Sequence, residues 1–175
     1  AFPIYVTRDL ERARQYARDR FQGEVQRRYG LVASSKADRH LLRHGIDCGF
    51  QATKKVKIGP WFNDPPDSSL SCCRLDVPIT EFQAQGLELD LPIVCWGDDF
   101  RQEGGRWSLR AGMRTGPLVH DPYRLRSNAY RVLLTRGREG LVIFVPPDAH
   151  MDATYAALLE AGAVAGEVGE QVRVA

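Results

Sequence analysis

The first 45 residues alternate between short apolar runs and segments whose apolar positions recur at helical spacing. Strands are predicted at Ile4 to Val6 and at Leu31 to Ala33. A predicted helix follows each strand, at Arg8 to Tyr16 and at Lys36 to His44. Thr7 is expected to cap the start of the first helix, and Gly45 is expected to end the second. Two strand-helix units in succession predict a parallel sheet.

The rest of the chain continues this order with two interruptions. Irregular insertions are expected at about 50–72 and 98–122, where Gly, Pro, Asp, Ser and Arg replace the regular pattern. Further strands are predicted at Cys73 to Val77, Leu91 to Trp96 and Leu141 to Val145, with an edge strand at Gln171 to Val174. Further helices are predicted at Arg124 to Thr135 and Met151 to Glu160. The pattern predicts a single α/β domain over residues 1–175.

The composition indicates the class of protein and its expected location, but it does not identify a function. The 175 residues are 43% hydrophobic, enough to bury one core, and the net charge of +2 gives no strong electrostatic signature for the whole chain. The four cysteines lack C-x-x-C spacing and no secretory leader is visible, which favours a reducing, cytoplasmic location. No apolar run approaches the roughly 18 residues of a membrane span, so no membrane partner is expected.

The segment Ile79 to Asp90 carries the most informative group of polar residues. In open α/β sheets, ligands bind beyond the carboxyl ends of the strands, and residues that follow predicted strands are therefore candidates. Thr80, Gln85, Gly86 and Glu88 provide a hydroxyl, an amide, a flexible glycine and a carboxylate, which are groups that hold a ribose or a phosphate. By composition alone, a simple turn with a solvated glutamate is the alternative.

Two ordered motifs resemble those of superfamily 1 helicases. The stretch T-E-F-Q-A-Q-G-L-E-L-D resembles the fifth helicase motif, and L-L-T-R-G-R-E-G-L-V-I resembles the sixth. With the opening I-Y-V-T-R-D-L-E-R-A, Y-G-L-V-A-S-S-K-A and W-F-N-D-P, nearly the whole chain resembles the C-terminal part of a domain-of-unknown-function family of helicase-like ATPases related to the Schlafen ATPase region.

The resemblance implies a RecA-like, three-layer domain of the P-loop NTPase type, the second motor domain of a helicase-like ATPase. The chain has no G-x-x-x-x-G-K-S/T phosphate-binding loop. ATP and Mg²⁺ would therefore be held mainly by an N-terminal RecA-like domain of the same, longer chain, and this domain alone is expected to be inactive. By motif match Arg136 is the arginine finger, while Gln85, Gly86 and Glu88 lie at the nucleotide edge.

The roles of the residues that neighbour Arg136 in and before the sixth motif are less specific. Arg138 is either a second phosphate contact or a turn cation, and Arg131 is expected to have a packing or salt-bridge role. Gly137 replaces the commoner alanine of the motif, a difference expected to matter little.

DNA or RNA is the expected polymer partner. Ser34, Ser35 and Lys36 follow a predicted strand and open a helix, which suits phosphate contact, although an ordinary helix cap explains them equally well. By its position in the fifth motif, Thr80 is expected to contact the nucleic-acid backbone. Trp61 and Phe62 either stack on bases or pack their loop down.

Three alternatives stay open. A zinc site would use His40, His44 and Cys48 with Cys72 or Cys73, but the spacing is poor and no metal is expected. A nuclease would use the acidic pairs at 88–90 and 98–99, which lack a following lysine motif. A non-catalytic α/β module that binds nucleic acid or protein would keep the scaffold without the ATPase.

Overall fold

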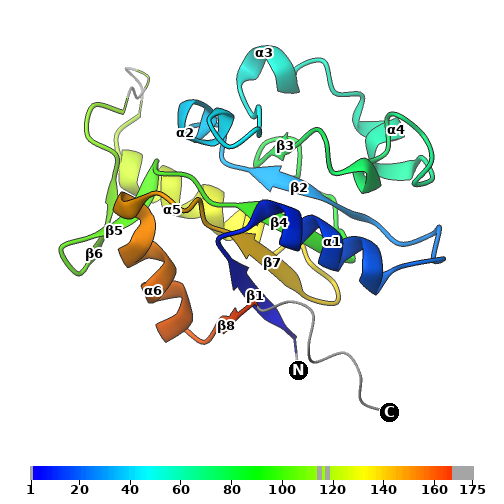
Figure 1. The fold of residues 1–175 in the computed structure, drawn as a ribbon. Helices are drawn as coiled ribbons and strands as arrows, with labels where there is room; N and C mark the ends of the chain where they lie inside the picture. The colour runs from blue at the N-terminus through cyan, green and yellow to red at the C-terminus, as the bar shows by residue number, and fades with distance from the viewer. Residues whose placement is uncertain (1, 114–115, 117–118, 167–175) are drawn as a thin grey trace.

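A six-stranded, wholly parallel sheet forms the centre of the computed structural model, which describes residues 2–113, 116 and 119–166 (Figure 1). The strand order is β3-β2-β4-β7-β1-β8. The strands are β1 (Ile4–Thr7), β2 (Tyr29–Ala33), β3 (Ile79–Thr80), β4 (Leu91–Cys95), β7 (Leu141–Phe144) and β8 (Val164–Ala165). A separate antiparallel hairpin contains β5 (Phe100–Glu103) and β6 (Arg106–Leu109).

Helices cover both faces of this sheet. The α-helices are α1 (Leu10–Arg20), α2 (Asp38–Leu42), α3 (Phe50–Thr53), α4 (Ile58–Asn63), α5 (Pro122–Leu134) and α6 (Asp152–Glu160). Single 3₁₀ turns are η1 (Cys72–Arg74) and η2 (Ala149–Met151). The chain crosses from β1 to β2 in one direction and from β4 to β7 in the other. Right-handed crossovers therefore place α1 and α5 on opposite faces, as Figure 1 shows.

The apolar core follows from the sequence of the central strands. Every residue of β2, β4 and β7 is buried, as expected for strands that are covered by helices on both faces. In β4 and β7 the buried side chains are almost all aliphatic. The predicted α/β class with a mainly parallel sheet is confirmed, and the layers agree with a RecA-like three-layer fold.

Several predicted elements need correction. Cys73 to Val77 is not a strand; η1 occupies its start, because Ser71 accepts a hydrogen bond from the Cys73 N–H and Leu75 has a left-handed backbone with φ of 60°. The first helix begins at Leu10 because Asp9, not Thr7, caps it by accepting from the Arg12 N–H.

The two expected insertions contain regular elements that the sequence pattern did not predict. The segment at about 50–72 contains α3 and α4, and the segment at 98–122 contains the β5-β6 hairpin. The predicted edge strand Gln171 to Val174 lies outside the described residues. Within residues 2–113, 116 and 119–166, no helix has the length and apolar character needed to cross a membrane.

Candidate functional site

The two motif segments lie side by side at the amino ends of the strands. Leu89 and Gly137 form a parallel β-bridge, in which the Leu89 N–H donates to Arg136 O and the Arg138 N–H donates to Leu89 O, both at 2.8 Å. The segments lead directly into β4 and β7. The expectation that this group lies beyond the carboxyl ends was therefore wrong for Glu88, because the chain returns to the amino ends of the strands between β3 and β4.

Arg136 contacts neutral acceptors. Its Nε donates to Val132 O at 3.0 Å, and one terminal nitrogen lies 3.3 Å from Leu87 O and 3.5 Å from Ala84 O. No carboxylate lies within ion-pair distance of Arg136 in the described part of the chain. The half-buried guanidinium thus lies next to the glycine turn of the other motif with no carboxylate partner among the described residues.

The other predicted nucleotide-edge residues surround the same turn. Gly86 has a φ of +79°, the left-handed conformation that glycine adopts without strain, and it ends the turn that begins after Thr80. Glu88 accepts a hydrogen bond from Arg138 Nε at 3.0 Å, and both side chains are more than half exposed. Gln85 is exposed one position before the glycine. The structure therefore brings Gly86, Glu88, Arg136 and Arg138 to one edge.

A polar hollow of about 690 Å³ opens beside Glu88 and Arg138. Its other side is the loop before β2, where the Arg27 guanidinium pairs with Asp90 at 3.4 Å and with Glu139. Asp90 also accepts the Arg28 N–H at 2.7 Å, which ties this loop to the fifth-motif segment. The hollow is thus framed by ion pairs and is continuous with the motif residues.

Gly137 is more constrained than the sequence indicated. A Cβ added there would lie 2.3 Å from Gly140 O, a backbone atom that cannot rotate away. The expectation that alanine at this position would matter little was therefore wrong. Arg131, expected to pack or pair, is exposed and forms no salt bridge with any described residue.

At the opposite edge, the predicted nucleic-acid residues join a buried polar network. Ser34 is fully buried, and its hydroxyl donates to Asp99 at 2.5 Å and accepts from Arg126 at 2.6 Å. Ser35 donates from both its N–H and its hydroxyl to Glu81. Lys36 is exposed. Of these three neighbouring residues, Lys36 is the one that presents its polar group to solvent.

Thr80 is also turned inward. Its N–H donates to Gln83 Oε1 at 3.1 Å, its hydroxyl lies 3.4 Å from the same atom, and the residue is 5% exposed. The amide of Gln83 then donates to Thr53 O at 2.8 Å, which joins this turn to α3. Thr80 therefore starts the turn and its hydroxyl is not presented to solvent.

The network around Arg126 is buried and contains one cation with two carboxylates. Arg126 lies 2.9 Å from Glu81 and 3.5 Å from Asp99, and all three residues are below 5% exposed. Burial raises the pKa of Asp99, while hydrogen bonds from Ser34 and Tyr130 act in the opposite direction. Sequence reasoning considered Asp99 only as part of an acidic pair and missed Glu81 and Arg126; Glu81 directly follows β3, a strand that the pattern did not predict.

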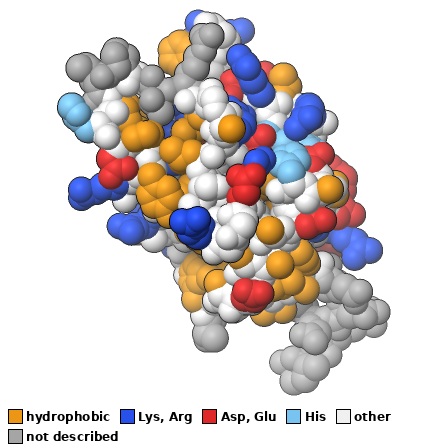
Figure 2. Space-filling view, turned by 90° about the vertical axis from the view of Figure 1, so that its left-hand side faces the viewer, with side chains coloured by type: hydrophobic (Ala, Val, Ile, Leu, Met, Phe, Trp, Pro, Cys, Tyr) orange, Lys and Arg blue, Asp and Glu red, His pale blue; other side chains and the backbone are white. Residues whose placement is uncertain are grey.

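A second polar cluster gathers histidines beyond the carboxyl ends of β4 and β7. His40 and His44 both place Nε2 2.7 Å from one oxygen of Asp148. Burial by itself would raise the pKa of Asp148, but these two hydrogen bonds lower it to about 2. Figure 2 shows histidine side chains at this surface with acidic and basic side chains beside them.

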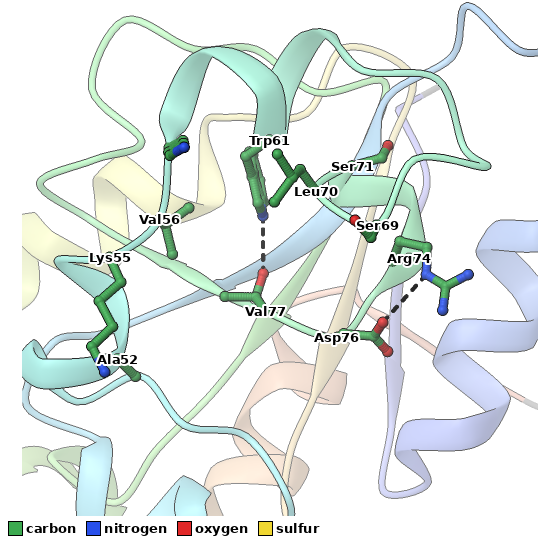
Figure 3. Close-up of a pocket in the computed structure, with 11 residues that line it drawn as sticks. Ala52, Lys55, Val56, Trp61, Ser69, Leu70, Ser71, Arg74, Asp76 and Val77 are labelled. Atoms are coloured by element: carbon green, nitrogen blue, oxygen red, sulfur yellow. Dashed lines mark hydrogen bonds and ion pairs between the residues drawn. The ribbon is translucent and has the colours of Figure 1, made fainter.

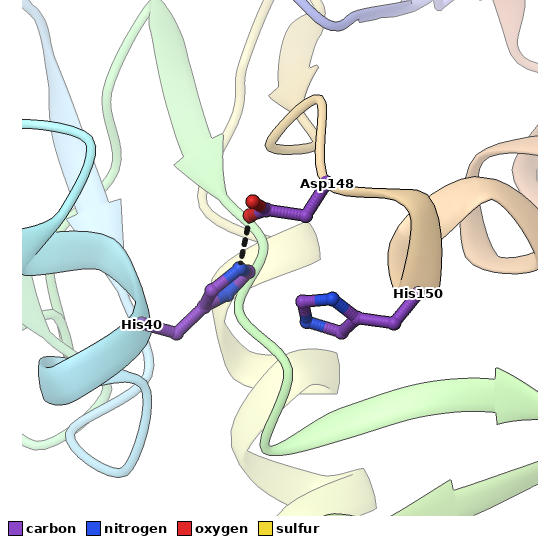
Figure 4. Close-up of side chains that lie close together, drawn as sticks. All are labelled: His40, Asp148 and His150. Carbon is purple, nitrogen blue, oxygen red and sulfur yellow. Dashed lines mark hydrogen bonds and ion pairs between the residues drawn. The ribbon is translucent and has the colours of Figure 1, made fainter.

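His40, Asp148 and His150 lie close enough together to be considered as metal ligands (Figure 4). However, the backbone N–H of Asp98 donates to His40 Nδ1 at 3.1 Å, so the proton of neutral His40 is on Nε2, the atom that faces Asp148. Nε2 in this tautomer has no lone pair for a metal. Burial lowers the pKa of His40, which also favours the neutral ring.

The zinc ligands considered from the sequence do not meet. Cys48 is buried with its sulfur 3.5 Å from Ser34 O, near the carboxyl end of β2. Cys73 lies near the other end of that strand, with its sulfur 3.4 Å from Arg27 O. His40 therefore cannot share one ion with Cys73 in this fold.

The Trp61 region forms an apolar cavity of about 240 Å³ (Figure 3). Trp61 is 2% exposed, and its indole N–H donates to Val77 O at 3.0 Å. Figure 3 shows Val56 and Leu70 beside the indole. Trp61 packs the insertion down onto the domain and is not exposed for stacking on a base.

The comparison with known families identifies the relationship. Residues 1–147 match the family model described as Schlafen group 3, DNA/RNA helicase domain. Neither the curated proteins nor the solved structures contain a significant match. The family match covers both motif segments and all of the candidate nucleotide-edge and nucleic-acid residues.

Proposed function

The chain belongs to the Schlafen group 3 DNA/RNA helicase domain family, and we propose that it is the second motor domain of a superfamily 1 helicase-like ATPase. In this proposal Arg136 is the arginine finger that stabilises the transferring γ-phosphoryl group. A partner RecA-like domain of the same protein supplies the phosphate-binding loop and holds ATP with Mg²⁺.

The observation that carries the proposal is that the guanidinium of Arg136 has no counterion among the described residues. Its described contacts are to carbonyl oxygens and the Thr135 hydroxyl, at 3.0 to 3.5 Å. A guanidinium paired to a carboxylate would lose that pair on turning to a phosphate, whereas Arg136 exchanges weaker neutral acceptors for an anion. Its place between α5 and β7 puts it on the edge that Glu88 also occupies.

Glu88 and Arg138 have supporting roles in this proposal. Their exposed pair at 3.0 Å is weak in water, so it can open without large cost when a nucleotide arrives. Glu88 would then accept from a ribose hydroxyl, and Arg138 would contact a phosphate. Gln85 and Gly86 shape the turn between this edge and the nucleic-acid side of the domain.

The test is turnover by the full-length protein with Arg136→Ala. An arginine finger is worth about 10³ to 10⁵ in rate, so kcat should fall by at least about a thousandfold while ATP affinity changes little. Arg131→Ala is the matched control, because Arg131 is an exposed arginine five residues away without a salt bridge among the described residues.

Normal hydrolysis by Arg136→Ala would refute the finger assignment. If the full-length wild-type protein neither binds nor hydrolyses ATP, the ATPase proposal fails as a whole and a non-catalytic binding module takes its place. Steady-state phosphate release and ATP binding by fluorescence anisotropy separate these two outcomes.

A further inference from the structure

We propose that the segment of residues 36–57, together with Phe82, forms a face that binds single-stranded nucleic acid by contacting phosphates and stacking bases on Phe50 and Phe82. We call this the basic face. It deepens the proposed function by locating the polymer on a face that lies outside the two helicase motifs except for Phe82, and it rests on that function for its biological role.

The first argument is charge. Residues 36–57 contain six lysines and arginines against two aspartates, a surplus of four, whereas the entire chain has a net charge of only +2. All four lysines of the chain fall in this segment. The six cations are Lys36, Arg39, Arg43, Lys54, Lys55 and Lys57. The remainder of the chain is therefore net negative, and the positive charge is concentrated here.

The second argument is that these cations are not paired with acidic side chains of the described residues. All six are exposed, and none forms a salt bridge with a described residue. By contrast, arginines on α1 pair with nearby acids, as Arg12 does with Asp9 and Arg14 with Glu11. A cluster of unpaired cations repels itself and is favourable only when counterions or a polyanion lie against it.

The third argument is the exposure of two aromatic rings. Phe50 is 74% exposed and Phe82 is 64% exposed, in a chain whose other large aromatic side chains are mostly buried. Lys54 Nζ lies 5.5 Å from the centroid of the Phe50 ring, so a cation and a stacking surface occur together. This combination is typical of proteins that bind single strands without sequence preference.

The fold places these features at one edge of the sheet. Gln83, next to Phe82, donates to Thr53 O in the helix that begins with Phe50. Cys48 contacts Ser34 O at 3.5 Å, which holds the start of α3 close to Ser34 and hence to Lys36. In Figure 1, α2 and α3 lie above β2 and β3, away from the amino end of β7.

Nearby acids do not cancel the charge. The two aspartates of the segment, Asp38 and Asp47, are already counted in its surplus of four positive charges, and Asp47 also accepts the Gly49 N–H at 3.1 Å in the turn before α3. Glu81, adjacent to Phe82, is 4% exposed and is paired with Arg126. The basic face therefore presents mainly cations and aromatic rings to solvent.

The experiment measures binding of the 175-residue chain to fluorescein-labelled single strands, oligo-dT and oligo-rU of 20 nucleotides, and to a DNA duplex of equal length. We expect both single strands to bind more tightly than the duplex. Phe50→Leu and Phe82→Leu should each weaken single-strand binding by about 5- to 150-fold, the effect of one stacked base, because leucine keeps the volume but not the aromatic face.

Charge variants supply an independent readout. Lys54→Gln should lower the slope of log K against log salt by about 0.7, the value for one phosphate contact on a single strand. Arg106→Gln, on the hairpin strand β6, is the matched control, because Arg106 is also exposed and has no ion pair among the described residues, and it should change neither affinity nor slope.

The basic face is refuted if neither single strand binds at 50 mM salt, if duplex binds as tightly, or if both leucine variants bind like wild type. Equal binding of labelled polyglutamate would also refute it, because that polymer offers charge without bases. These results are distinguishable from failure of the ATPase proposal, since they concern the binding of a polymer and leave turnover by the Arg136 variant as a separate measurement.

Discussion

Removing the Arg126 side chain is expected to cause a large loss of stability. Arg126 is 3% exposed and is the cation nearest to two buried carboxylates, Glu81 and Asp99. Arg126→Leu would leave both carboxylates in the interior without a cation. Breaking a buried pair from one side costs about 3 to 5 kcal/mol, against a total stability of about 5 to 15 kcal/mol. For a domain of this size, the midpoint of thermal unfolding should fall by roughly 6 to 20 °C.

The pH dependence of this variant gives a second signature. Burial already raises the pKa of Asp99, and the Arg126 guanidinium acts in the opposite direction, so without this guanidinium the folded-state pKa of Asp99 should rise further. A raised pKa of an acid destabilises the folded state at pH above that pKa, so Arg126→Leu should recover part of its loss as the pH falls from 7 towards 5. The wild type, in which Arg126 still faces Asp99, should gain less stability over the same range.

Urea unfolding followed by circular dichroism measures both effects. The control is Arg131→Leu, an exposed arginine on the same helix, α5, which is expected to change the free energy of unfolding by less than about 0.5 kcal/mol. If Arg126→Leu falls within 1 kcal/mol of this control at pH 7, the network does not depend on its cation and the electrostatic reasoning is wrong.

Two further predictions concern the glycine of the sixth motif and the histidine cluster. Gly137→Ala should lose about 1 to 3 kcal/mol in urea unfolding because its Cβ meets Gly140 O, whereas Gly59→Ala, with no atom within 4 Å, should be neutral or stabilising; equal stabilities would contradict the clash. Asp148→Asn should cost about 1 kcal/mol at pH 7, a value reduced for the 31% exposure of the Asp148 side chain. Because the folded pKa of about 2 lies below the unfolded value, the wild type loses this contribution between about pH 4 and 2, and acid titration of Asp148→Asn should be flatter there.

The parallel sheet could be predicted because its strands are short apolar runs. Several of the segments between them have apolar positions at helical spacing. L-P-I-V-C-W and L-V-I-F are continuous apolar runs that are too short for a typical helix, which favours buried strands. The strand predicted at Cys73 to Val77 failed because a serine cap and a left-handed leucine decide its conformation. Such local hydrogen bonds are not visible as periodicity.

Only part of the candidate site could be predicted from the sequence. Motif resemblance selected Glu88 and Arg136, but it gave no information on which end of the sheet they occupy. The buried network around Arg126 joins residues from four segments that are distant in the sequence, so no local pattern indicates it. Exposure of Phe50 likewise follows from tertiary packing, since an isolated phenylalanine in a short helix is more often buried.

The segment that joins β3 to β4 connects the two proposed binding edges. At its start, Gln83 bonds Thr80 and the last residue of α3; at its end, Ala84 O and Leu87 O accept from Arg136. If Arg136 turns towards a γ-phosphate, those two carbonyls lose their guanidinium donor, and the turn that carries Phe82 loses a restraint. Conversely, a base stacked on Phe82 would restrict the same turn. Because the two sets of contacts are separated by only a few residues, nucleotide and polymer would each bias one short element, which is the physical condition for coupling between them.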